Sequence, residues 1–160
     1  MEDSRKYWVG FNLVKGIGAV RFGALLDAFG DAETAWRSGE AELAGLGLGA
    51  KVIETFVQVR RQIDLDQIWE NILRQGIRVL TWMEAEYPRR LLEIDQPPPV
   101  LYLKGELSPE DHWAVAMVGT RRMTPYGRQA TEEIARYLGS HGVTVVSGLA
   151  RGVDGVAHQA

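Results

Sequence analysis

The chain has 160 residues, a hydrophobic content of 46%, no cysteine, and a net charge of −3 from 18 basic and 21 acidic residues. These values are typical of one medium globular domain or two small ones, and they exclude disulfides, thiolate metal sites and cysteine nucleophiles. The longest apolar run, residues 113–118, is far too short to cross a membrane, so we expect a cytoplasmic protein that makes no membrane contact.

The first half of the sequence carries a short internal repeat. Residues 16–19 (GIGA) recur 31 residues later as residues 47–50 (GLGA). Apolar residues follow each copy at helical spacing: Phe22, Leu25, Leu26, Ile53, Phe56 and Val57. A helix, a Gly-x-Gly turn and a second helix form a helical hairpin, and two hairpins can pack together. The repeat therefore predicts an all-α tandem helix-hairpin-helix domain, of the SAM-like type, over residues 1–76.

The Gly-x-Gly turns have two interpretations. Backbone amides at a helix N-terminus suit a phosphate, and Lys15 and Arg21 add positive charge. Alternatively, the glycines only make the turn. Residues 1–65 hold eight basic and nine acidic side chains, so no strongly basic face is expected. This balance favours the turn-making interpretation.

The middle of the chain marks the end of the helical domain. Residues 64–75 have a continuous apolar stripe at helical spacing, and Gly76 follows where a helix would end. Residues 77–81 have the β-branched content of a strand. We therefore place a domain boundary near Gly76. The three prolines at 97–99 predict an extended segment that leads into a strand at 100–103.

The second half alternates strands and helices. Residues 114–118 form a continuous apolar run, which is typical of a strand buried on both faces. A helix over about 125–140, with Thr124 as its N-cap, leads to a second apolar strand at 143–147. A further helix begins near Val156. The pattern predicts an α/β fold, with a partial, extended Rossmann-like parallel sheet over residues 77–160.

Each of the two later strands ends in a loop that contains glycines and arginines. Arg121 and Arg122 follow the first strand, and Arg151 follows the second. Because the carboxyl ends of parallel strands lie at one edge of a sheet, these loops are expected to converge there. Glycines permit close approach of a ligand to the backbone, and arginine forks match phosphate oxygens. The loops therefore predict an anion site, although adjacent arginines usually point in different directions.

Three polar residues near the second loop have less specific interpretations. Ser147 is expected to bond a loop amide or a phosphate, because no His-Asp pattern supports a nucleophile. Asp154 is expected to cap the last helix, and His158, four residues later, to make a structural hydrogen bond. No metal site is expected. A phosphate-binding Walker motif and a dinucleotide fingerprint are both missing, which indicates neither an ATPase nor a nicotinamide enzyme.

The two loop motifs resemble one known family. Residues 118–127 (VGTRRMTPYG) and 145–158 (VVSGLARGVDGVAH) are similar to motifs of the DNA-processing protein A (DprA/Smf) family. The resemblance also includes Tyr87-Pro88, the proline segment, residues 101–105 (LYLKG) and the leading helical hairpins. It thus extends over nearly the whole chain.

The resemblance implies a cytoplasmic, bacterial, single-stranded DNA-binding protein without established catalysis or cofactors. Such proteins protect incoming strands in natural transformation and help to load the bacterial recombinase, and the full-length protein forms a homodimer. The implied DNA-binding residues are Gly119, Thr120, Arg121, Ser147, Gly148, Arg151 and Gly152, to which the loop analysis adds Arg122. The family usually has Ser at the position of Thr120, which keeps the hydroxyl. Tyr126 either stacks on a base or packs internally.

Two other functions stay open. A nucleotide-phosphate hydrolase of the lysine-decarboxylase-like group also places glycine and arginine loops around a phosphate, although it needs a later glycine-rich motif with a glutamate. A protein-interaction module would use the helical hairpins as its docking surface. The Rossmann-like domain of the family extends past the position of His158, so we expect either a fragment of a longer protein or a sheet that another chain completes.

Overall fold

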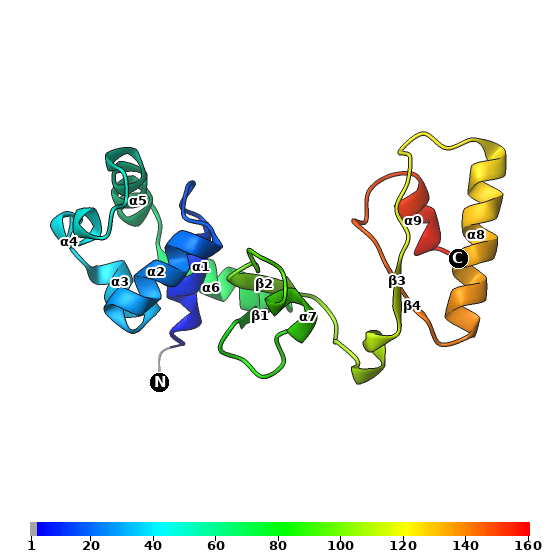
Figure 1. Cartoon of the computed structure of the whole chain (residues 1–160), viewed down its shortest axis with the longest axis horizontal. Helices are drawn as coiled ribbons and strands as arrows, with labels where there is room; N and C mark the ends of the chain where they lie inside the picture. The colour runs from blue at the N-terminus through cyan, green and yellow to red at the C-terminus, as the bar shows by residue number, and fades with distance from the viewer. Residues whose placement is uncertain (1–2) are drawn as a thin grey trace. The chain divides into compact units, whose positions relative to one another are not determined.

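The computed structural model describes residues 3–160, without the side chains of residues 109 and 110. The chain divides into two compact units, Met1–Gly105 and Glu106–Ala160, which we call the first and second units. The elements of the first unit are α1 (Arg5–Asn12), α2 (Ala19–Phe29), α3 (Ala32–Arg37), α4 (Glu40–Gly45), α5 (Ala50–Gln62), α6 (Leu65–Arg74), β1 (Arg78–Thr81), α7 (Arg89–Leu92) and β2 (Val100–Leu103). Those of the second unit are η1 (Pro109–His112), β3 (Ala114–Ala116), α8 (Pro125–Ser140), β4 (Thr144–Val146) and α9 (Val153–Ala157) (Figure 1).

The Gly-x-Gly repeat forms the predicted turns. Gly16 has a φ of +100° and Gly47 a φ of +76°, a region that side chains disfavour. The helices after them, α2 and α5, begin at Ala19 and Ala50, which are equivalent residues of the two repeat copies. The two predicted hairpins, α1–α2 and α4–α5, are therefore confirmed.

Aromatic residues join the two hairpins in one core. Phe11 of α1 stacks on Phe56 of α5, with ring centroids 5.4 Å apart and planes 7° from parallel. Trp36 of α3 meets both rings edge-on at 5.1 Å. Phe11 and Phe56 are fully buried. Aromatic pairs in these geometries add to the stabilisation from apolar burial, so this trio holds the helices together.

The first unit also contains the pair of strands β1 and β2. They run antiparallel, with Val79 opposite Tyr102. Val79 and Val100 are buried in the same core as the helices, and the Arg5 Nη1 donates a hydrogen bond of 3.0 Å to the Val79 carbonyl. The compact units consequently divide after Gly105, although the sequence places the domain boundary near Gly76. That boundary stays a prediction.

The second unit is built on a β–α–β arrangement. β3 and β4 are parallel, with Ala114 opposite Thr144, and α8 connects them. The Thr124 hydroxyl accepts a hydrogen bond of 3.1 Å from the Gly127 amide, and Pro125 occupies the first turn of α8. The predicted N-terminus of this helix is confirmed, and the fold is α/β as expected.

The predicted burial of the strand after residue 113 is wrong. Val115 and Val118 are exposed, as is Val146 on β4. Within residues 3–160, each of these two strands pairs only with the other, so they lack the neighbours that would bury an apolar run. The buried residues of α8 are Thr131 and Ala135, whereas the apolar Ile134 and Tyr137 are exposed. Among the described helices, none is long and apolar enough to cross a bilayer.

Candidate nucleic-acid interface

Two loops meet at the carboxyl ends of β3 and β4. We call residues 117–124 the first loop and residues 147–152 the second loop. The Met117 amide donates to the Val146 carbonyl at 2.8 Å, which continues the parallel ladder up to the start of both loops. Because the strands run in the same direction, both loops leave the same edge of the sheet. The predicted convergence is confirmed.

The backbones of the loops touch at Gly152. This residue has a φ of +91°, and a Cβ built on it would lie 2.2 Å from the Thr120 carbonyl oxygen and 2.7 Å from the Arg121 Cα. The next amide, of Val153, donates to the same Thr120 oxygen at 3.2 Å. Only glycine can occupy this position without separating the loops.

The Asp154 carboxylate bridges the two loops through hydrogen bonds from their backbone amides. It is buried and accepts hydrogen bonds from the Gly119 amide at 3.3 Å, the Gly148 amide at 3.1 Å and the Ala150 amide at 3.4 Å. The prediction that Asp154 caps the last helix is wrong, because α9 begins at Val153 with Gly152 as its N-cap. The Gly119 and Gly148 amides are thus engaged within the protein.

Two hydroxyl groups shape the loops. The Ser147 Oγ lies 2.8 Å from the His158 Nε2 and accepts a hydrogen bond of 3.0 Å from the Leu149 amide. The Thr120 hydroxyl accepts from the Arg122 amide at 3.1 Å. The predicted bond of Ser147 to a loop amide and the predicted hydrogen bond of His158 are both confirmed. Eleven residues separate Ser147 from His158, so their pairing has no sequence signal and follows from the return of α9 to the end of β4.

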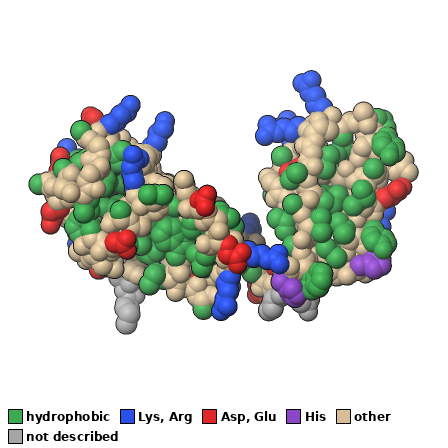
Figure 2. Space-filling model, in the orientation of Figure 1, with side chains coloured by type: hydrophobic (Ala, Val, Ile, Leu, Met, Phe, Trp, Pro, Cys, Tyr) green, Lys and Arg blue, Asp and Glu red, His purple; other side chains and the backbone are tan. Residues whose placement is uncertain are grey.

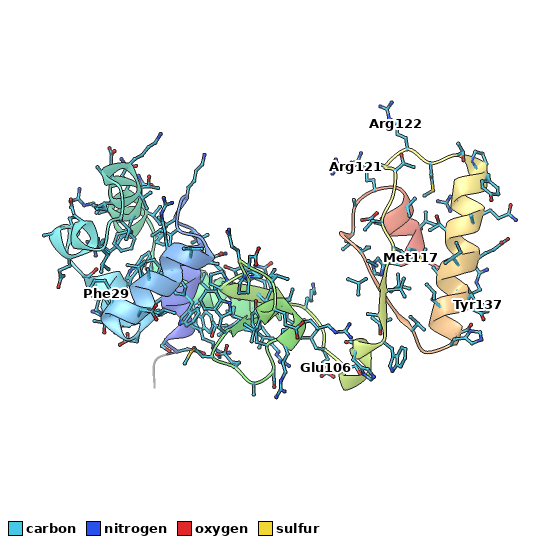
Figure 3. All side chains as sticks on the ribbon, viewed as in Figure 1. Phe29, Glu106, Met117, Arg121, Arg122 and Tyr137 are labelled. Carbon is cyan, nitrogen blue, oxygen red and sulfur yellow. The ribbon has the colours of Figure 1, made fainter. Side chains whose placement is uncertain are left out.

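The arginines of the loops carry unpaired charge. Arg121, Arg122 and Arg151 are exposed. Within residues 3–160, none of their guanidinium groups forms an ion pair or a hydrogen bond. The side chains of Arg121 and Arg122 leave the first loop in different directions (Figure 3). By contrast, in the described part of the chain carboxylates pair with other arginines, namely Arg5, Arg37, Arg78 and Arg128. Basic side chains project from the end of the second unit where the loops lie (Figures 2 and 3).

Other features of the site bear on its chemistry. Tyr126, at the start of α8, is 81% exposed and so does not pack within the second unit. Among the described His, Asp and Glu residues, no group of three could hold a metal ion. The eight residues that the sequence singled out all lie on the two loops. The sequence did not single out Asp154 as the residue that joins the two loops.

This geometry defines an α/β protein with unpaired cations and glycine-rich loops at the carboxyl edge of a parallel sheet. A family model described as DNA recombination-mediator protein A matches residues 78–160. The chain belongs to this family, and the predicted resemblance is confirmed.

Individual relatives agree with this assignment. The chain is 36% identical to Protein Smf of Synechocystis over 161 residues, which is 98% of this chain and 40% of that protein. It is 37% identical to the DNA processing protein DprA of Bacillus subtilis over 87 residues, which is 54% of this chain and 29% of that protein. The chain therefore spans well under half the length of these relatives.

A solved structure shares the fold. The X-ray structure of DNA processing protein A from Streptococcus pneumoniae matches 96% of this chain and 52% of its own chain, with a TM-score of 0.69 and 24% identity. The match extends over both units, so the helical hairpins and the β–α–β arrangement occur in one chain there as well.

Proposed function

We propose that this chain binds single-stranded DNA at the two loops, with Arg121 and Arg151 on successive phosphates. The observation that carries the proposal is the backbone contact between the loops, which brings exposed arginines without carboxylate partners to one edge of the sheet. Thr120, Ser147 and Gly152 fix the shape of the loops, and Gly119 and Gly148 allow their close packing. Arg122 adds positive charge beside them.

The family gives this binding a biological setting. The chain belongs to a family of DNA recombination mediators. We propose that the protein is cytoplasmic, protects incoming single strands in natural transformation and helps to load the bacterial recombinase onto them. We also propose that the full-length protein forms a homodimer. No cofactor and no catalytic step are required, because holding a strand needs only cations and shape.

The physical basis is charge neutralisation. An arginine that neutralises a phosphate releases condensed counterions, so affinity falls as salt rises, with a slope of about −0.7 per contact for a single strand. The guanidinium fork also matches two phosphate oxygens at once. The overall charge of −3 does not oppose this, because residues 113–160 hold five arginines and three acidic residues.

The test is a titration of labelled oligodeoxythymidylate by fluorescence anisotropy at several salt concentrations. Arg121→Ala is expected to weaken binding about tenfold and to reduce the salt slope by about 0.7. Arg136→Ala is the matched control, because Arg136 is also exposed but lies on α8 away from the loops. Equal effects of the two substitutions would contradict the proposal.

A nucleotide-phosphate hydrolase is the alternative, and the Ser147–His158 hydrogen bond is the observation that favours it. A serine next to a histidine can be activated as a nucleophile. However, within residues 3–160 no carboxylate pairs with His158, so the third group of such a site is not in place. Release of free base from nucleoside monophosphates by the protein, abolished in Ser147→Ala, would support this alternative over DNA binding.

A further inference from the structure

Leu149, in the second loop, has an unusual backbone conformation. Its φ is +51°, and in residues 3–160 every other residue with a positive φ is a glycine. Leucine disfavours this region because its Cβ crowds the following carbonyl oxygen. A leucine at such a position calls for a reason that lies in its side chain.

The surrounding hydrogen bonds hold Leu149 in this conformation. The amides of three successive residues are engaged: Gly148 and Ala150 by the Asp154 carboxylate, and Leu149 by the Ser147 hydroxyl. The loop is therefore fixed at its base, and the direction of the leucine side chain is fixed with it.

The Leu149 side chain nevertheless has no packing role within the second unit. It is 73% exposed. Leu149 is thus an exposed apolar residue between two residues whose amides the Asp154 carboxylate holds, on the same loop as Arg151.

Apolar side chains do not attract phosphates, but they can pack on the face of a nucleobase. We propose that Leu149 contacts the face of an unpaired base of the strand whose phosphates the loop arginines hold. The inference rests on the proposed function and deepens it. A duplex keeps its base faces stacked inside the helix, so this contact favours single strands and is independent of sequence.

The test compares two probes of equal length, an oligodeoxythymidylate and an abasic oligodeoxyribose phosphate. Leu149→Asn removes the apolar side chain while asparagine tolerates a positive φ, so the loop keeps its shape. We expect this variant to lose about five- to tenfold in affinity for the oligodeoxythymidylate and to bind the abasic probe as the wild type does. Arg121→Ala is expected to weaken binding of both probes.

The control and the contrary outcomes separate the two proposals. Tyr137→Ala removes another exposed apolar side chain, near the far end of α8 from the loops, and is expected to change neither affinity (Figure 3). Equal losses on both probes in Leu149→Asn would mean that Leu149 acts through loop shape, and no loss on either would mean no contact. Both results overturn the inference while leaving the arginine site intact. If the wild type binds neither probe, the result contradicts the proposed function itself.

Discussion

Gly152→Ala tests the contact that brings the two loops together. The new Cβ would lie 2.2 Å from the Thr120 carbonyl oxygen, whereas real Cβ contacts are not shorter than about 3.0 Å. The two atoms nearest to the new Cβ, the Thr120 carbonyl oxygen and the Arg121 Cα, both belong to the backbone, so no flexible side chain can move aside. The first and second loops must separate, or the chain must leave the φ of +91°.

The magnitude follows from two costs. A residue with a side chain in this region of backbone space costs about 1–3 kcal/mol, and loss of the bond from the Val153 amide to the Thr120 carbonyl costs about 0.5–1.5 kcal/mol. We expect the second unit to lose roughly 2–4 kcal/mol of its free energy of unfolding. Affinity for oligodeoxythymidylate should fall at least tenfold, because the separated loops no longer hold Arg121 and Arg151 in one fixed arrangement.

The assay is a urea titration followed by the NMR signals of residues 106–160, so that the first unit does not contribute. Gly139→Ala is the matched control, because a Cβ there meets nothing within 4 Å and the residue lies in α8. Alanine at that helical position should be neutral or stabilising by up to about 1 kcal/mol. A Gly152→Ala protein as stable as the wild type, with unchanged DNA affinity, would refute the reasoning about loop contact.

Three further predictions concern stability. Asp154→Asn places an amide group opposite three backbone donors, so we expect the second unit to lose about 1–3 kcal/mol in the same urea titration, and no loss would show that the carboxylate does not tie the loops. Phe56→Ala should destabilise the first unit by about 3–5 kcal/mol in thermal unfolding, because its ring is fully buried between Phe11 and Trp36. Hydrogen bonds from the Thr34 amide and hydroxyl lower the pKa of Asp31. Asp31 is the N-cap of α3. Because its folded pKa is lowered, its carboxylate stabilises the fold fully above the unfolded pKa of about 3.9, and this stabilisation is lost as pH falls through the folded pKa. Asp31→Ala should cost about 1 kcal/mol at pH 7 and almost nothing at pH 2, and an equal cost at both would contradict the capping role.

The sequence predicted the parts of the fold that depend on local chemistry. The turns at Gly16 and Gly47, and the cap at Thr124 with Pro125 after it, require particular residues at fixed spacing, and all formed as expected. The convergence of the loops was predictable too, because it follows from the direction of parallel strands. These features do not depend on which residues pack against an element.

The features that sequence reasoning missed depend on distant neighbours. Asp154 and Gly119 are 35 residues apart, so the carboxylate's bond to that amide has no local signature, whereas a cap on α9 has one. The burial of residues 114–118 was predicted wrongly for the same reason. An apolar run indicates a strand, but the neighbouring strands and helices decide how far Val115 is covered. Nothing in the sequence distinguishes Leu149 from other apolar loop residues, because its positive φ is visible only in the structure.

The central claim is that a polyanion lies on the two contacting loops. Amide chemical-shift mapping of the 160-residue chain with oligodeoxythymidylate tests it most directly, because it reports on both loops and on the helical hairpins in one experiment. The largest changes are expected at residues 118–123 and 147–153, on both loops together and with the same dependence on added DNA. Changes concentrated in the helical hairpins, or on one loop alone, would contradict the account.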